Sequence, residues 1–416
     1  MAATLPSSWE ELPPELLGLV LHRLPSLGDR VRLRAVCRPW RAGALVQRQQ
    51  EKPLPPPLPW LALRDGSLVD LDGAPVRCAP ILRKGIYSYR AVDDLAFLVH
   101  DDGGSSLVNP LSGFTLDPPE LAPAVHRAID GMRTYYNHSH IRKAHVKAIL
   151  SSPVESTPDP LVAVLILEGF SVVISACKQH KVINNESREE SKSSTKIHDV
   201  AFFQEKLYAL TGREGLYAVE LRAGSLGAPD LSSGGFHRCI TEDPDQLPIY
   251  DPREHQIYYR GTGDDPEYLV LRYLAESNGR LLMMRRWMCH PRDSMLGDHD
   301  QTFQFEVFEA DLFRVPGRWM KVDSLGGHAI FLGSECTKSV LASQCAGGVQ
   351  EDCVYFMHRI FDNPAKEFLG PCVDPLADSG VYNVRDGRIT PLLPEGVMVE
   401  LRRKQQYLTW FFPVDA

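Results

Sequence analysis

Four cysteines in the C-terminal part of the sequence are the residues best suited to hold a metal ion. They are Cys336, Cys345, Cys353 and Cys372. Zinc sites usually take cysteine ligands in pairs about two to four residues apart, whereas these are separated by nine, eight and nineteen positions. The spacing therefore favours free thiols that serve as small core residues, and we expect no metal.

A histidine-rich basic segment is the second place where chemistry could occur. It comprises Tyr135, Tyr136, His138, His140, Arg142, Lys143, His145 and Lys147. A metal site needs histidines that converge with a further ligand, and a nucleic-acid site needs many basic residues interleaved with stacking aromatics. One short patch on a chain of net charge -8 does not meet these conditions. We expect a solvated loop that leads into one strand over 144–150, and no nucleic-acid partner.

Known catalytic motifs are missing from the sequence. It has no Gly-x-x-x-x-Gly-Lys-Ser/Thr phosphate loop and no Gly-x-Ser-x-Gly nucleophile elbow. The tripeptide Asp298-His299-Asp300 is interpreted as an exposed turn. The sequence thus predicts a non-catalytic protein without a cofactor.

Composition indicates a globular protein in a reducing compartment. Nine cysteines are scattered over 416 residues without a Cys-x-x-Cys pair, and the first residues lack the basic and apolar regions of a signal peptide. The longest apolar stretch is interrupted by Glu168-Gly169-Phe170, so it predicts a β-hairpin and not a membrane span. We expect the protein in the cytoplasm and/or the nucleus, without a membrane partner.

Residues 9–48 have a helical pattern. Apolar residues recur at helical spacing from Leu16 to Leu24, and Pro13-Pro14 and Pro25 mark the ends of a first helix. A second helix is predicted from Asp29 to Cys37 and a third from Trp40 to Gln47. Three short helices cannot bury all of this apolar surface, so a partner or the rest of the chain must cover it.

The remainder of the sequence reads as a linker followed by a β domain. Residues 49–59 include five prolines within 53–59, which indicates a semi-rigid polyproline spacer. Residues 60–416 show short strands, Asp-Gly turns and a degenerate repeat of an apolar residue followed by Tyr, which is typical of a β-propeller. The polar stretch 184–196 is predicted to be a disordered loop.

The helical segment resembles an F-box, and the β domain resembles the KIB-type propeller of plant F-box proteins. The F-box resemblance lies in the Leu12-Pro13 start and in the ending Val36-Cys37-Arg38-Pro39-Trp40-Arg41. In the β domain, the turn Asn109–Gly113 and the run Trp319–Gly333 are the most specific matches. The resemblance implies an all-α F-box of three helices and an all-β domain, a β-propeller of degenerate Kelch-like repeats.

The resemblance also implies a function. It is that of a substrate-recognition adaptor of an SCF-type cullin-RING E3 ubiquitin ligase: the F-box docks on the S-phase-kinase-associated linker protein, and through it on a cullin, while the propeller binds a target protein. A non-ligase F-box scaffold and a propeller enzyme are the alternatives. The residues expected to form the docking face are Leu12, Pro13, Leu16, Val20, Leu24, Leu33, Val36 and Trp40.

Overall fold

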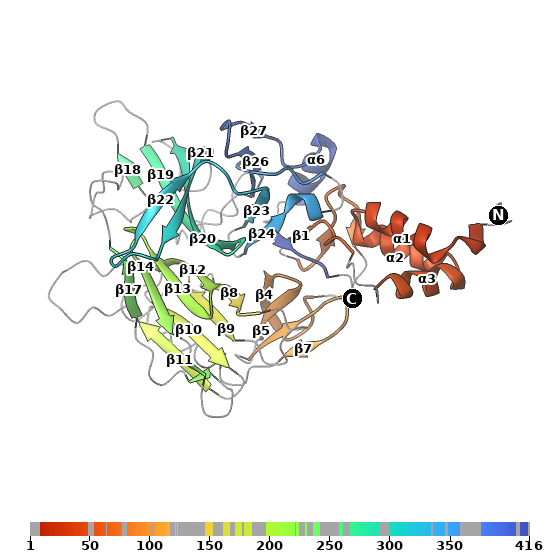
Figure 1. Ribbon diagram of the computed structural model, residues 1–416, viewed down its shortest axis with the longest axis horizontal. Coiled ribbons are helices and arrows are strands. Elements are labelled where there is room, and N and C mark those ends of the chain that lie inside the picture. The colour runs from red at the N-terminus through yellow and green to blue at the C-terminus, as the bar shows by residue number, and fades with distance from the viewer. Residues whose placement is uncertain are drawn as a thin grey trace.

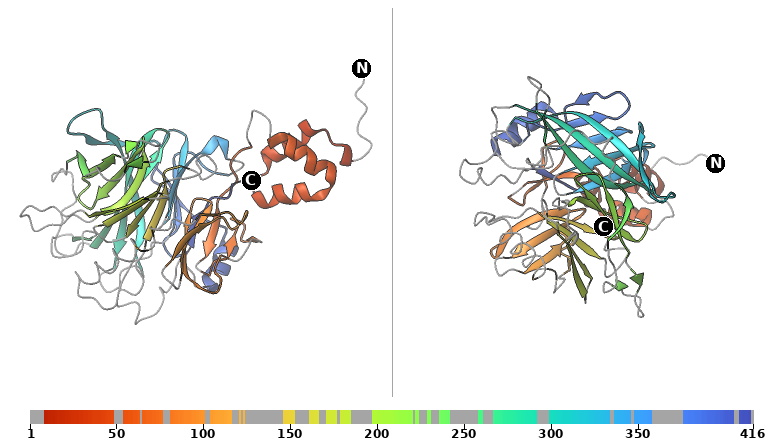
Figure 2. Two further views of the ribbon diagram at one scale, coloured as in Figure 1. Left: turned by 90° about the horizontal axis from the view of Figure 1, so that it is seen from below. Right: turned by 90° about the vertical axis from the view of Figure 1, so that its left-hand side faces the viewer.

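A small helical module lies at the edge of a large β domain in the computed structural model (Figure 1). The left view of Figure 2 shows the module projecting from the side of that domain. The structure describes residues 9–48, 54–63, 65–76, 81–100, 104–116, 121, 123, 146–152, 161–166, 171–176, 179–184, 197–220, 222–223, 229–230, 236–241, 258–260, 267–291, 299–333, 336–345, 348–357, 376–404 and 408–414. The predicted loop 185–196 and the patch 135–145 lie outside these ranges.

The helical module contains the three predicted helices. They are α1 (Pro14–Arg23), α2 (Leu27–Val36) and α3 (Arg38–Arg48), preceded by the 3-10 turn η1 (Trp9–Glu11). Pro14 occupies the first turn of α1, where its missing N–H has no intrahelical partner to lose. Pro25 lies between α1 and α2, where it prevents a continuous helix.

Six sheets of four or five strands make up most of the β domain in the described ranges. The first, in spatial order, has β28 (Leu408–Phe411), β1 (Trp60–Leu63), β2 (Leu68–Val69) and β3 (Pro75–Val76). The second has β4 (Ile86–Val92), β5 (Leu95–His100), β6 (Ser105–Val108) and β7 (Thr115–Leu116). The third has β11 (Gln179–Asn184), β10 (Ser171–Ala176), β9 (Val162–Ile166) and β8 (Val146–Leu150).

The other three sheets follow along the chain. The fourth has β12 (Ile197–Phe203), β13 (Lys206–Thr211), β14 (Leu216–Glu220) and β17 (Phe236–Ile240). The fifth has β18 (Tyr258–Arg260), β19 (Glu267–Ser277), β20 (Arg280–His290), β21 (Gln301–Asp311) and β22 (Arg318–Val322). The sixth has β24 (Thr337–Leu341), β23 (His328–Leu332), β25 (Cys353–Phe356), β26 (Gly380–Asn383) and β27 (Ile389–Thr390).

Smaller elements accompany the sheets. They are the ribbon of β15 (Arg222–Ala223) and β16 (Pro229–Asp230), the turn η2 (Ala342–Gln344) and the helix α6 (Glu395–Lys404). The predicted hairpin in the long apolar stretch is β9–β10, whose strands pair antiparallel. The Asp-Gly turns at 65–66 and 72–73 are also confirmed: both glycines have φ above +80°, a conformation that glycine adopts without strain.

The six sheets close into a ring. Each of six hydrophobic clusters draws most of its residues from two sheets that follow each other around this ring. The ring closes where the last strand, β28, pairs antiparallel with β1, so that Trp60 lies opposite Phe411 and their rings stack. The fold is therefore a β-propeller, in which sheets repeat radially around the ring.

A set of buried polar side chains connects four of the sheets inside the ring by hydrogen bonds. The Lys147 ammonium on β8 donates to Asp199 on β12 at 2.6 Å and to the Thr337 hydroxyl on β24 at 3.3 Å. The Asp199 carboxylate also accepts the backbone N–H of Leu274 on β19 at 2.8 Å. Lys147 and Asp199 are both almost fully buried. We call Lys147, Asp199 and Thr337 the central clasp.

Two expectations about polar residues are wrong. Lys147, assigned to a solvated basic patch, is buried in the central clasp, because the predicted strand at 144–150 is β8 and its side chain meets Asp199. Asp300, expected in an exposed turn, is buried because its carboxylate contacts the imidazole of His290 on β20.

The cysteines lie where a small apolar residue would lie. Cys336 and Cys353 are buried in one hydrophobic cluster, and burial raises the pKa of the Cys336 thiol to about 12. A thiol with such a pKa stays protonated and is a poor metal ligand at neutral pH. In the described ranges, no group of three or more His, Cys, Asp or Glu side chains could hold a metal ion.

The central clasp predicts a strong stability effect. Replacing Lys147 by Met leaves the Asp199 carboxylate buried without its cation, so we expect the free energy of unfolding to fall by about 3 kcal/mol. Lys321→Met is the matched control, because Lys321 also pairs with a carboxylate at 2.6 Å but is largely exposed; its loss should cost less than about 1 kcal/mol. Urea unfolding followed by tryptophan fluorescence measures both variants, and equal losses would contradict the role of the clasp.

Candidate docking face of the helical module

The helical module has a small core of its own. It is formed by the buried side chains of Leu17, Leu21, Leu33 and Ala44, with Leu12, Leu24, Trp40 and Leu54 packed around them. The Trp40 indole N–H also donates to the carbonyl of Trp9 at 2.8 Å, which fixes η1 against α3. The module is therefore held together by residues from all three helices.

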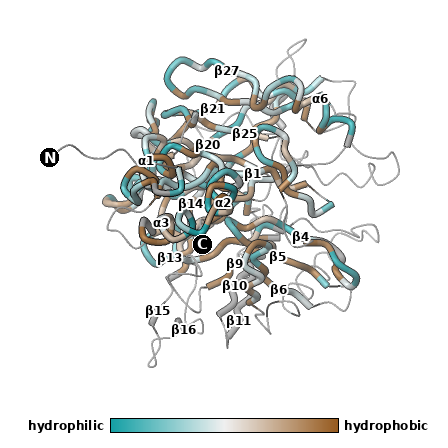
Figure 3. The backbone as a smooth tube through the Cα atoms, turned by 90° about the vertical axis from the view of Figure 1, so that its right-hand side faces the viewer, coloured by the Kyte–Doolittle hydropathy of each residue, from teal (hydrophilic) through white to brown (hydrophobic). Residues whose placement is uncertain are grey.

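Several large apolar side chains point away from this core. On α1, Leu16, Leu19 and Val20 are 47%, 60% and 41% exposed, and their spacing of three and four residues places them on one helix face. Val36 at the end of α2 is 62% exposed. Figure 3 faces this module and shows hydrophobic stretches among the hydrophilic ones in its helices. We call Leu16, Leu19, Val20 and Val36 the apolar face.

The structure divides the eight residues expected to form the docking face into three groups. Leu16, Val20 and Val36 are exposed, and Leu33 is buried in the core of the module. The others are half-buried and support the module from its edge: Leu12, Pro13, Leu24 and Trp40. The exposed members present the largest apolar area to a partner.

Some exposed apolar residues are not among those expected to form the docking face. Leu19 follows the helical spacing of Leu16 and Val20 but is absent from that set, although the spacing places it on the same helix face. Trp9, Val31, Leu45 and Val46 are also exposed. Their orientation depends on how α2 and α3 pack against α1, and no local pattern reports that.

The helical module is seated on the propeller through α2. Leu27, at the start of α2, is buried in a cluster that otherwise consists mainly of residues from the first two sheets, including Trp60 and Phe411. A leucine shared in this way removes apolar surface of both parts from water. The module and the propeller therefore have a common hydrophobic contact.

A polar contact lies beside Leu27. Arg30 is fully buried; its Nε donates to the carbonyl of Leu24 at 2.9 Å, and its Nη1 donates to the carbonyl of Pro55 at 2.8 Å. The backbone N–H of Leu58 donates to the carbonyl of Pro25 at 3.0 Å. The described part of the proline-rich linker, 54–59, which we call the strap, is thus hydrogen-bonded to the module at two points.

Two comparisons with family models agree with this architecture. The model "F-box-like" matches residues 9–45, which are η1, α1, α2 and most of α3. The model "KIB1-4 beta-propeller" matches residues 84–383, from just before β4 to the end of β26. The chain is an F-box protein of the KIB1-4 β-propeller family. The sheet formed by β28 and β1–β3 lies outside the matched propeller region.

A plant F-box protein matches most of the chain. The F-box protein At2g26160 of Arabidopsis thaliana is 21% identical over 354 residues, which are 85% of this chain and 96% of that protein. Among solved structures, the β-propeller domain of Cps50 (Swd1) from Myceliophteria thermophila is 11% identical, with a TM-score of 0.28 over 79% of this chain and 91% of that one. A TM-score this low supports no structural argument.

Membrane insertion by a helix finds no support in the structure. Within the described ranges of this F-box protein, none of the helices is both long and apolar enough to cross a membrane.

The contact of Arg30 with the strap predicts a measurable change in local opening. Arg30→Met keeps the apolar stem but removes the donors to Leu24 and Pro55, at a cost of about 2 kcal/mol for hydrogen bonds made by a charged group. We expect the backbone N–H of Leu58, which is bonded to Pro25, to exchange with deuterium at least about tenfold faster in this variant. Arg32→Met is the control, because Arg32 is exposed and its guanidinium pairs with Asp29 of the same helix. Unchanged exchange of the Leu58 N–H in Arg30→Met would contradict the proposed fastening.

Proposed function

We propose that this F-box protein is a substrate-recognition adaptor of an SCF-type cullin-RING E3 ubiquitin ligase. The helical module docks on the S-phase-kinase-associated linker protein, which connects it to a cullin. The propeller binds a target protein, and the sequence of the propeller does not specify which protein that is. The chain itself contributes no catalytic residue or cofactor, and it acts in the cytoplasm and/or the nucleus.

The observation that carries this proposal is the apolar face. The core of the module is already filled by Leu17, Leu21, Leu33 and Ala44, so Leu16, Leu19 and Val20 are not needed to fold it. Adjacent exposed leucine and valine side chains on one helix are typical of a helix-in-groove contact. Their burial against a partner would supply the apolar anchors on which interface affinity usually depends.

The seat of the module on the propeller supports the same role. An adaptor raises the effective concentration of target lysines near the ubiquitin-loaded enzyme, and this gain depends on the geometry of the link between its two binding sites. Leu27 in the propeller cluster and Arg30 bonded to the strap limit the orientations that the module can adopt. A bound target would therefore be presented in a restricted set of positions.

The proposal predicts which substitutions abolish docking. Leu16→Asp/Val20→Asp places two charges on the apolar face and leaves the buried core intact. Because anchor residues of an interface contribute about 2 kcal/mol or more each, we expect affinity for the linker protein to fall at least about thirtyfold. Titration calorimetry with the purified linker protein measures this change.

A matched control separates docking from general damage. Ile389→Asp/Val399→Asp puts the same charges on β27 and α6, at apolar residues of similar exposure. This variant should bind the linker protein like the wild type. If both double variants bind equally well, the helical module is not the docking site.

A scaffold that only sequesters its target protein would dock on the linker protein in the same way. In a reconstituted ligase, however, it would leave that target protein free of ubiquitin.

A further inference from the structure

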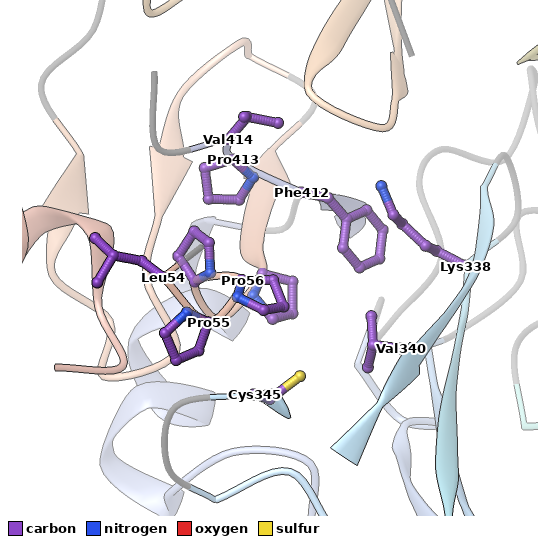
Figure 4. Close-up of a pocket in the computed structure, with 11 residues that line it drawn as sticks. Leu54, Pro55, Pro56, Lys338, Val340, Cys345, Phe412, Pro413 and Val414 are labelled. Carbon is purple, nitrogen blue, oxygen red and sulfur yellow. The ribbon is translucent and has the colours of Figure 1, made fainter. Parts of the chain in front are cut away.

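A cavity of about 400 Å³ lies between the strap, β24 and the end of the chain. Figure 4 shows Pro55 and Pro56 of the strap on one side, Val340 and Phe412 on the other, and Cys345 below them. The volume is within the range of sites that bind small organic molecules, about 300–1,000 Å³. Such sites are frequent where two parts of a protein meet.

The strap forms a mainly apolar wall that is poor in hydrogen-bond donors. Pro55, Pro56, Pro57 and Pro59 line the cavity, and proline has no backbone N–H. The wall is held in place because Arg30 donates to the carbonyl of Pro55 and Leu58 donates to the carbonyl of Pro25. The four proline rings therefore offer a ligand mainly apolar contact on this side.

The opposite wall is equally well supported. Lys338 and Val340 are two residues apart on β24, so they project from the same face of the strand and both line the cavity. The ring of Phe412 packs edge-on against Phe331 with centroids 5.7 Å apart, and the Phe412 backbone N–H donates to the carbonyl of Asp93 at 2.8 Å. These contacts form the cavity before any ligand arrives.

The charges at the cavity restrict the class of ligand. The Lys338 ammonium lies 3.0 Å from the Asp93 carboxylate and 4.9 Å from the centre of the Phe412 ring. Because Asp93 already compensates this cation, an anionic ligand would be repelled by the carboxylate. A neutral oxygen can still accept a hydrogen bond from Lys338, since an ammonium has three donors.

Cys345 takes part by packing and not by covalent chemistry. Its thiol lines the cavity, and burial raises the pKa of this thiol, so it stays protonated at neutral pH. A protonated thiol is a weak nucleophile.

We propose that this cavity binds a neutral, mainly apolar small molecule with one oxygen acceptor directed at Lys338. The site is separate from the apolar face of the helical module, and it does not depend on the function proposed above. A bound molecule would contact the strap, so it would also stabilise the seat of the module on the propeller.

The probe for this site is 6-propionyl-2-dimethylaminonaphthalene, a neutral dye with an apolar ring system, one ketone oxygen and emission that shifts to the blue in apolar surroundings. We expect the full chain to bind it saturably at one site. Val340→Trp fills the cavity and should weaken binding at least about tenfold. Val399→Trp, the same change on the surface of α6, should leave binding unchanged.

A second measurement uses the wild-type chain and follows the reactivity of Cys345. At mildly alkaline pH, where more of the Cys345 thiol is ionised, bound dye should slow its alkylation by N-ethylmaleimide and leave Cys239 and Cys289 unaffected, as peptide mass spectrometry can show. Prior alkylation should abolish dye binding in the wild type but not in Cys345→Ser. Dye binding that is non-saturable, that persists in Val340→Trp, or that does not protect Cys345 overturns the proposal.

Discussion

The seat of the helical module depends on one buried cation. Arg30 reaches from α2 to the carbonyl that ends α1 and to the carbonyl of Pro55, so a single side chain connects two helices and the strap. Burying a guanidinium is costly unless it is hydrogen-bonded, and here Nε and Nη1 donate to backbone oxygens six and 25 residues away in the sequence. Leu27 lies one helical turn before Arg30 and packs into the propeller. The contact between module and propeller is therefore both apolar and polar.

The propeller is a rigid support for the helical module because two kinds of contact hold its sheets together. Hydrophobic clusters join each sheet to the next, and β28 returns to pair with β1 directly after the strap. Inside the ring, the central clasp links sheets that are not neighbours. The strap therefore leads into a strand that is paired on both sides. The helical module packs through Leu27 on the cluster formed where the ring closes.

Much of this organisation could be predicted from local sequence. Pro14 and Pro25 mark α1, and Asp65-Gly66 and Asp72-Gly73 mark turns of the first sheet, because backbone geometry decides these features. The role of Lys147 could not be predicted, since its partner Asp199 is 52 residues away and is brought near only when the ring closes. For the same reason the sequence identified Leu33 as apolar but not as buried. The fit of the strap to Arg30 is likewise a contact of tertiary structure.

The central claim is that the apolar face docks a partner while the propeller remains free to hold a target. Hydrogen–deuterium exchange of the full chain, with and without the purified linker protein, tests it most directly. The account predicts slower exchange in α1, α2 and α3 on addition of the linker protein, and unchanged exchange in the sheets from β4 to β26. Protection in those sheets, or no protection in the helices at saturating linker protein, would contradict it.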